Sequence, residues 1–139
     1  MINIEPGVVV VVVAVVVVVV VNFGLVEYIF FVGWLGKVDL KYLACQHHHV
    51  MVETLRSSSK AAGFVERVAV LGLGGGALCT YLHHAFPSFS IDGVEIDPVM
   101  VHLAKKYFGF TPSANLQAHV ADAYQFIQEL AIDPERNSR

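Results

Sequence analysis

Three groups of residues in this chain of 139 residues have types and spacing that suit a nucleoside ligand. The first is the glycine-rich stretch Gly72–Gly76, where missing side chains let a ligand approach the main chain closely. The others are Glu95 and Asp122, each of which ends a short apolar stretch. A carboxylate at such a position can accept hydrogen bonds from the hydroxyls of a ribose or meet an adenine edge. Together these groups predict a site for a nucleoside cofactor.

Alternating strands and helices must position these groups. Short apolar or alternating stretches predict three strands, and apolar residues at helical spacing follow each of them. Asp97 and Pro98 are typical of a helix start, and Asp122 predicts the cap of the last helix. The predicted strands are residues 67–71, 90–95 and 116–120, with helices over 77–86, over 98–108 and after Asp122.

The order of these elements predicts an α/β fold with a parallel sheet and right-handed crossovers. In such a sheet, ligands bind beyond the carboxyl ends of the strands. The glycine stretch, Glu95 and Asp122 all fall at that edge, so the fold and the candidate site agree.

The spacing of the glycines leaves the cofactor open. Gly72, Gly74 and Gly76 fit the GxGxG loop of S-adenosylmethionine enzymes. Gly72, Gly74 and Ala77 fit the GxGxxG/A fingerprint of dinucleotide-binding enzymes equally well.

A further helix is predicted before the glycine stretch, over residues 42–56, and the three serines at 57–59 end its pattern. We expect Cys45 and Cys79 to be small core residues rather than nucleophiles. No metal site is predicted at residues 47–49 or 83–84, because neighbouring helical histidines point in different directions and cannot share one ion.

Composition excludes several functions. The formal net charge of −3 gives no basic surface for nucleic acid. Two cysteines are too few for a disulfide framework, so we expect reduced thiols and a cytoplasmic protein. Thirteen valines and one alanine fill residues 8–21. This run is shorter than the roughly 18–20 residues that span a bilayer, so no membrane association is expected.

Three stretches carry a family resemblance: VLGLGGGALCTYL, DGVEIDPVMVHLAKKYFGF and HVADAYQFIQEL. Over residues 38–131 the chain resembles the first half of a class I S-adenosylmethionine-dependent methyltransferase. The branch is the one that shares its core with spermidine synthase, and the methyltransferase-like protein 13 family is most similar. The resemblance implies a partial Rossmann-like fold, S-adenosylmethionine as cofactor, and methyl transfer to a protein lysine or N-terminal amine, with translation elongation factor 1-alpha as the known type of substrate.

The same resemblance implies roles for single residues, while catalytic residues stay unknown. Tyr42 and His48 are candidates for the lining of the acceptor pocket. The implied cofactor-binding residues are Gly72, Gly74, Gly75 and Gly76 beside the methionyl part, Glu95 at the ribose hydroxyls, Ile96 beside the adenine, and Asp122 with Ala123 at its edge.

Three alternatives to a methyltransferase stay open. A spermidine-synthase-like aminopropyltransferase is disfavoured because Ala77 stands where those enzymes carry an aspartate that helps bind the cofactor's amine end. A dinucleotide-dependent oxidoreductase is supported by the glycines alone. A non-catalytic remnant would bind a partner through an exposed sheet edge.

The resemblance also suggests a division of the chain. We expect a low-complexity valine run and irregular segment over residues 1–37, and a truncated cofactor-binding domain over 38–139. The run is interpreted as a repeat expansion or gene-model artefact, with a buried strand or a membrane-associating segment as alternatives. Three strands of about seven are predicted. This leaves the strand at 67–71 without a partner on its far side, and we expect a partial gene product that lacks acceptor binding.

Overall fold

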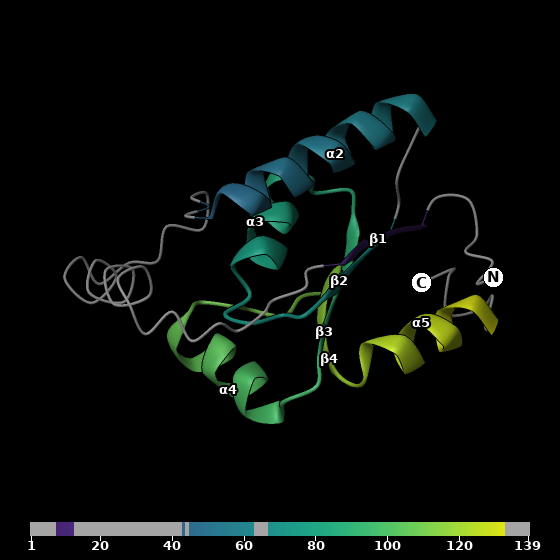
Figure 1. Cartoon of the computed structure of the whole chain (residues 1–139). Coiled ribbons are helices and arrows are strands. Elements are labelled where there is room, and N and C mark those ends of the chain that lie inside the picture. Colours follow the sequence, from purple (N-terminus) through teal and green to yellow (C-terminus); the bar gives the residue numbers. More distant parts are fainter. Residues whose placement is uncertain (1–7, 13–42, 44, 63–66, 133–139) are drawn as a thin grey trace.

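The computed structural model describes residues 8–12, 43, 45–62 and 67–132. Strands and helices alternate along this part of the chain, as predicted (Figure 1). The strands are β1 (Val8–Val12), β2 (Arg67–Leu71), β3 (Ser90–Glu95) and β4 (Leu116–Val120), and the helices are α2 (Gln46–Ala62), α3 (Ala77–Ala85), α4 (Pro98–Tyr107) and α5 (Ala123–Ile132).

The four strands form one parallel sheet in the order β1-β2-β3-β4. The three predicted strands are confirmed, but the expectation that β2 lacks a partner on its far side is wrong. Val8 to Val12 pair there in parallel, from Val8 opposite Arg67 to Val12 opposite Leu71. Valine is β-branched and favours extended backbone, and the edge of β2 offers N–H and C=O groups to such a strand. Residues 13–21 of the valine run lie outside the described residues.

Helices cover both faces of the sheet (Figure 1): α2, α3 and α4 pack on one face and α5 on the other. Alternation along β2 builds both cores. Val68 and Val70 point into the cluster with α2, α3 and α4, whereas Ala69 and Leu71 pack with Phe126 of α5. These four residues of β2 are buried, which explains why residues 68–71 form a continuous apolar run.

The helices around the site start and end where the sequence predicts. Asp97 caps α4, its side chain accepting a 2.8 Å hydrogen bond from the N–H of Val99, and Pro98 is the first helical residue. Gly109 follows α4 with φ 73°, the left-handed conformation expected of a residue after a helix. Helix α3 ends at Ala85, before Pro87.

Helix α2 differs from the prediction. It continues through the three serines to Ala62, because serine lowers helix stability only slightly and packing along the rest of the helix outweighs that cost. Val50 faces solvent at 66% exposure, whereas Val52 is buried. Cys45 precedes the helix and is exposed, so its assignment to the core is wrong, whereas Cys79 is fully buried as expected.

Among the described residues, no helix is both long and apolar enough to cross a membrane.

Candidate functional site

The loop after β2 owes its shape to three glycines with positive φ. Gly72, Gly74 and Gly76 have φ of 91°, 54° and 79°, backbone conformations that residues other than glycine rarely adopt. The N–H of Gly72 donates to the carbonyl of Val94, so the pairing with β3 continues into the loop. Gly76 then leads into α3, its carbonyl accepting the first helical hydrogen bond from Thr80 at 2.9 Å.

The glycines of this loop have different surroundings. A Cβ on Gly74 would meet no atom within 4 Å, so the main chain faces open space there. A Cβ on Gly75 would make ordinary contact with the ring of Phe108, at 3.4 Å. A Cβ on Gly76 would lie 2.7 Å from Cδ2 of Phe110. Gly76 is therefore required by packing, whereas Gly74 leaves an approach to the main chain that a ligand could use.

Glu95 forms hydrogen bonds with the loops that follow β2, β3 and β4 at the carboxyl edge of the sheet. Its Oε2 accepts a hydrogen bond from the N–H of Gly74 at 3.1 Å, and its Oε1 accepts one from the N–H of Asp97 at 3.2 Å. Its main-chain carbonyl accepts a third from the N–H of Ala121 at 3.0 Å. The side chain points toward the glycine loop, and its carboxylate is fixed at both oxygens.

This arrangement leaves Glu95 able to bind a ligand. A carboxylate has about four acceptor positions, two on each oxygen. The hydrogen bonds from Gly74 and Asp97 use one position on each oxygen. One position per oxygen is left, which matches the two neighbouring hydroxyls of a ribose.

The other predicted site residues lie at the same edge. Ile96 follows Glu95 and is 68% exposed, an unusual position for a large apolar side chain. Oδ1 of Asp122 accepts hydrogen bonds from the N–H groups of Tyr124 at 2.9 Å and Gln125 at 3.0 Å, so this carboxylate caps α5. Ala123 packs against the core beneath α5. The structure thus brings Glu95 and Gly74 into contact, while Asp122 and Ala123 have structural roles of their own.

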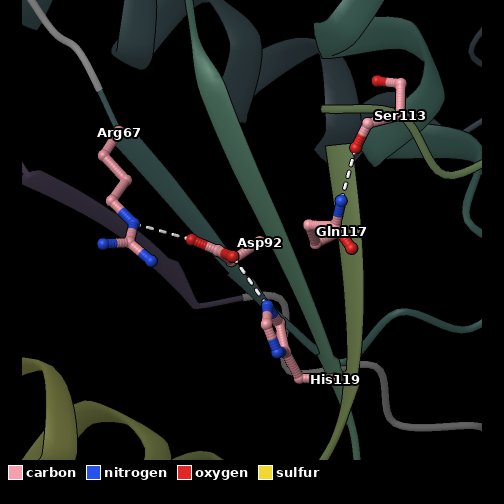
Figure 2. A network of polar contacts seen from close by, with 5 residues as sticks. All are labelled: Arg67, Asp92, Ser113, Gln117 and His119. Carbon is pink, nitrogen blue, oxygen red and sulfur yellow. Dashed lines mark hydrogen bonds and ion pairs between the residues drawn. The ribbon is translucent and has the colours of Figure 1, made fainter. Parts of the chain in front are cut away.

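A buried ionic network crosses the sheet and was not predicted from the sequence. Figure 2 shows Asp92 of β3 between Arg67 and His119, with Nε of Arg67 2.7 Å from Oδ2 and Nε2 of His119 2.7 Å from Oδ1. Burial alone would raise the pKa of Asp92, but the hydrogen bonds from His119 and Arg67 outweigh burial and hold that pKa below its ordinary value. The available signal was an aspartate inside a strand expected to be buried, because a buried charge requires partners.

This network runs across the sheet from the start of β2 toward the end of β4. Arg67 begins β2, whereas the loop follows the other end of that strand. The nearby Gln117 donates from its side chain to the main-chain oxygen of Ser113, also in Figure 2. We assign the network to the stability of the sheet.

Two further predicted residues can be placed. Burial, with a smaller effect of Asp92, raises the pKa of Cys79 to about 12, so this thiol is protonated at neutral pH and is no nucleophile. His48 is half-buried near the start of α2. Tyr42 lies outside the described residues, so its predicted place in an acceptor pocket stays a prediction.

Comparisons with known proteins agree on one group of relatives. The chain is 40% identical over 97 residues to the eEF1A lysine and N-terminal methyltransferase of Mus musculus, which covers 68% of this chain and 14% of that protein. It is 40% identical over 96 residues to the Drosophila melanogaster homolog, covering 66% of this chain and 14% of that protein. The matched stretch is thus about one seventh of the length of these relatives.

Two more comparisons concern an aminopropyltransferase and a solved methyltransferase structure. A polyamine aminopropyltransferase of Vibrio vulnificus is 38% identical over 71 residues, which cover 51% of this chain and 24% of that protein. The crystal structure of human methyltransferase-like protein 13 in complex with SAH superimposes with a TM-score of 0.58 and 38% identity, over 66% of this chain and 43% of that one. No family model matches the chain.

Proposed function

We infer, from the relationship of this chain to the eEF1A lysine and N-terminal methyltransferases, that its described residues form the cofactor-binding part of an S-adenosylmethionine-dependent methyltransferase. The sheet and its helices have the class I methyltransferase fold that the sequence resemblance predicted. The related structure of methyltransferase-like protein 13 contains SAH, which supports the choice of cofactor.

One observation carries this proposal: the carboxylate of Glu95 is held against the N–H of Gly74. The contact fixes an acceptor for ribose hydroxyls beside Gly74, where no atom lies within 4 Å of the Cβ position. A ribose bound at Glu95 would direct the methionyl part of the cofactor over the open Gly74, while the exposed Ile96 offers an apolar surface to the base. We propose that Asp122 and Ala123 face the edge of that base.

The bound cofactor would supply a methyl group that its sulfonium already activates. The residues of this chain would contribute orientation. Main-chain hydrogen bonds fix Glu95, and the conformations of Gly72, Gly74 and Gly76 hold the loop open beside it. We propose a protein amine as the acceptor, namely a lysine or an N-terminus of elongation factor 1A. A cytoplasmic location fits two cysteines that are both free thiols.

The test is isothermal titration calorimetry of the full chain with S-adenosylhomocysteine and, separately, with NAD. We expect the first to bind and the second not to bind. Glu95→Ala should weaken binding by at least about tenfold, because a hydrogen bond to a charged group contributes about 1.5–3 kcal/mol. Glu53→Ala is the matched control, since Glu53 is an exposed glutamate on α2. Binding of NAD, or unchanged affinity in Glu95→Ala, would contradict the proposal.

The Vibrio relative supports an aminopropyltransferase as the second candidate. Such an enzyme binds a cofactor whose tail carries an amine and no carboxylate, and an acidic side chain near the start of α3 would suit that amine. Ala77, the first residue of α3, has no such group. Decarboxylated S-adenosylmethionine should therefore bind no more tightly than S-adenosylmethionine. Stronger binding of the decarboxylated form would favour the second candidate.

A further inference from the structure

Three side chains with metal-binding atoms gather at the start of α2. Sγ of Cys45 and one ring nitrogen from each of His47 and His48 lie within 4.8 Å of one another. Ligands of a tetrahedral zinc ion lie about 2.0–2.3 Å from the metal and therefore about 3.5 Å from one another. Small side-chain rotations would bring the three atoms to that separation.

We propose that Cys45, His47 and His48 bind a divalent transition-metal ion of the zinc class. The expectation of no metal site at residues 47–49 concerned consecutive histidines on an ideal helix and did not include Cys45. Cys45 lies before the first helical residue, and its main-chain carbonyl accepts the N–H of His48 at 3.0 Å. The direction of the thiol is therefore not restricted by the angular spacing of side chains on a helix.

The two histidines approach each other although they are neighbours in the sequence. Their ring centroids are 4.4 Å apart with an interplanar angle of 66°, an edge-on contact. Each imidazole offers two nitrogens, so adjacent rings can present one each toward a common point. Cys45 then supplies the third position.

His49 has a different role. Its Nε2 donates to the main-chain oxygen of Leu43 at 2.8 Å, and Leu43 is buried in the core. This bond ties the residues before α2 to its first turn. It helps fix Cys45 relative to the histidines, because Leu43 lies only two residues before the cysteine.

The chemistry of the three donors selects the type of ion. A thiolate with two imidazoles suits zinc and similar late transition metals, whereas magnesium and calcium require oxygen ligands. Three protein ligands leave a fourth coordination position for water or another small ligand.

Cobalt(II) is the probe, because it replaces zinc and gives visible spectra. The full chain should bind one equivalent and develop a thiolate-to-cobalt charge-transfer band with the intense ligand-field bands of tetrahedral cobalt. Zinc should then remove both signals by displacement. Cys79 cannot supply the thiolate, because it is fully buried in the core.

Variants assign the signal to these residues. Cys45→Ser should abolish the charge-transfer band, and both it and His47→Ala should weaken binding by at least about tenfold. Both side chains are exposed, so these changes leave the core intact. His84→Ala is the matched control, an exposed histidine of the adjacent pair on α3. Absence of the band in the unmodified chain, or equal loss of affinity in His84→Ala, would overturn the proposal.

Discussion

The N–H of Gly74 donates a 3.1 Å hydrogen bond to Oε2 of Glu95 and so links the loops that follow two adjacent strands. The bond places the carboxylate of Glu95 next to a glycine whose Cβ position is open. Glu95 and Gly74 thus combine a carboxylate held in place with a main chain that a ligand can reach. This combination distinguishes a ligand site from a turn that is merely tight.

Two glycines of the loop allow this interpretation to be tested. Gly74→Ala should cost about 1–2 kcal/mol of stability, because alanine is strained at φ 54° but meets no atom there. It should weaken S-adenosylhomocysteine binding by at least about tenfold, since the methyl group enters the proposed ligand space. Denaturant unfolding and calorimetry measure the two effects.

Gly76→Ala is the comparison. Here the added methyl group also meets the ring of Phe110 at 2.7 Å, so we expect a loss of about 3 kcal/mol or more. If Gly74→Ala bound the ligand as tightly as the unmodified chain, the open space above Gly74 would have no role in binding.

Local signals explain which parts of the fold the sequence could predict. Glycines, the Asp97-Pro98 pair and short apolar stretches each act over a few residues, and β2, β3, β4 and their helices follow them closely. The contact between Glu95 and Gly74 was also within reach, because both residues end or follow adjacent parallel strands.

Features that depend on distant partners were not predictable in the same way. The pairing of Val8 with Arg67 joins residues far apart in the chain, and no local pattern states which strand edge the valines will find. Asp92 has its partners 25 and 27 residues away, so the network becomes visible only once the register of the sheet is known. Cys45 was misplaced because α2 begins at Gln46, so Cys45 lies before the helix and not within it.

Asp122 should separate a structural role from a binding role. Asp122→Ser keeps an N-cap side chain for α5, so stability should stay within about 0.5 kcal/mol, whereas Asp122→Ala should lose about 1 kcal/mol. We expect both variants to bind S-adenosylhomocysteine several-fold more weakly, because both lack the carboxylate. Normal affinity in Asp122→Ser would limit Asp122 to capping α5.

Asp92 should make stability depend on pH. Its pKa is lower in the folded chain than in the unfolded chain, so its contribution is complete above the unfolded pKa of about 4 and is lost as pH falls through the folded value. Asp92→Asn should therefore be less stable by about 3 kcal/mol at pH 7 and show a flatter stability profile below pH 5. Unfolding by denaturant across this range measures both effects.

The matched control for this experiment is Asp97→Asn, an exposed aspartate whose capping role asparagine can take over. It should keep the pH dependence of the unmodified chain. A profile for Asp92→Asn that falls as steeply in acid as that of the unmodified chain would show that other carboxylates dominate acid unfolding.

The pairing of β1 with β2 can be tested from the valine side. Val10 lies opposite Ala69, and proline at that position has no N–H for a strand and restricts the backbone. Val10→Pro should therefore speed hydrogen exchange of the β2 amides that face β1, measured by mass spectrometry on peptides containing residues 67–71. Strand β4 should change much less, because β3 and β2 separate it from β1. Val10→Thr is the control, since threonine is also β-branched and keeps its N–H. Equal exchange of β2 in the two variants would mean that β1 does not protect the edge of β2, and the glycine strand would then be the outer strand of the sheet.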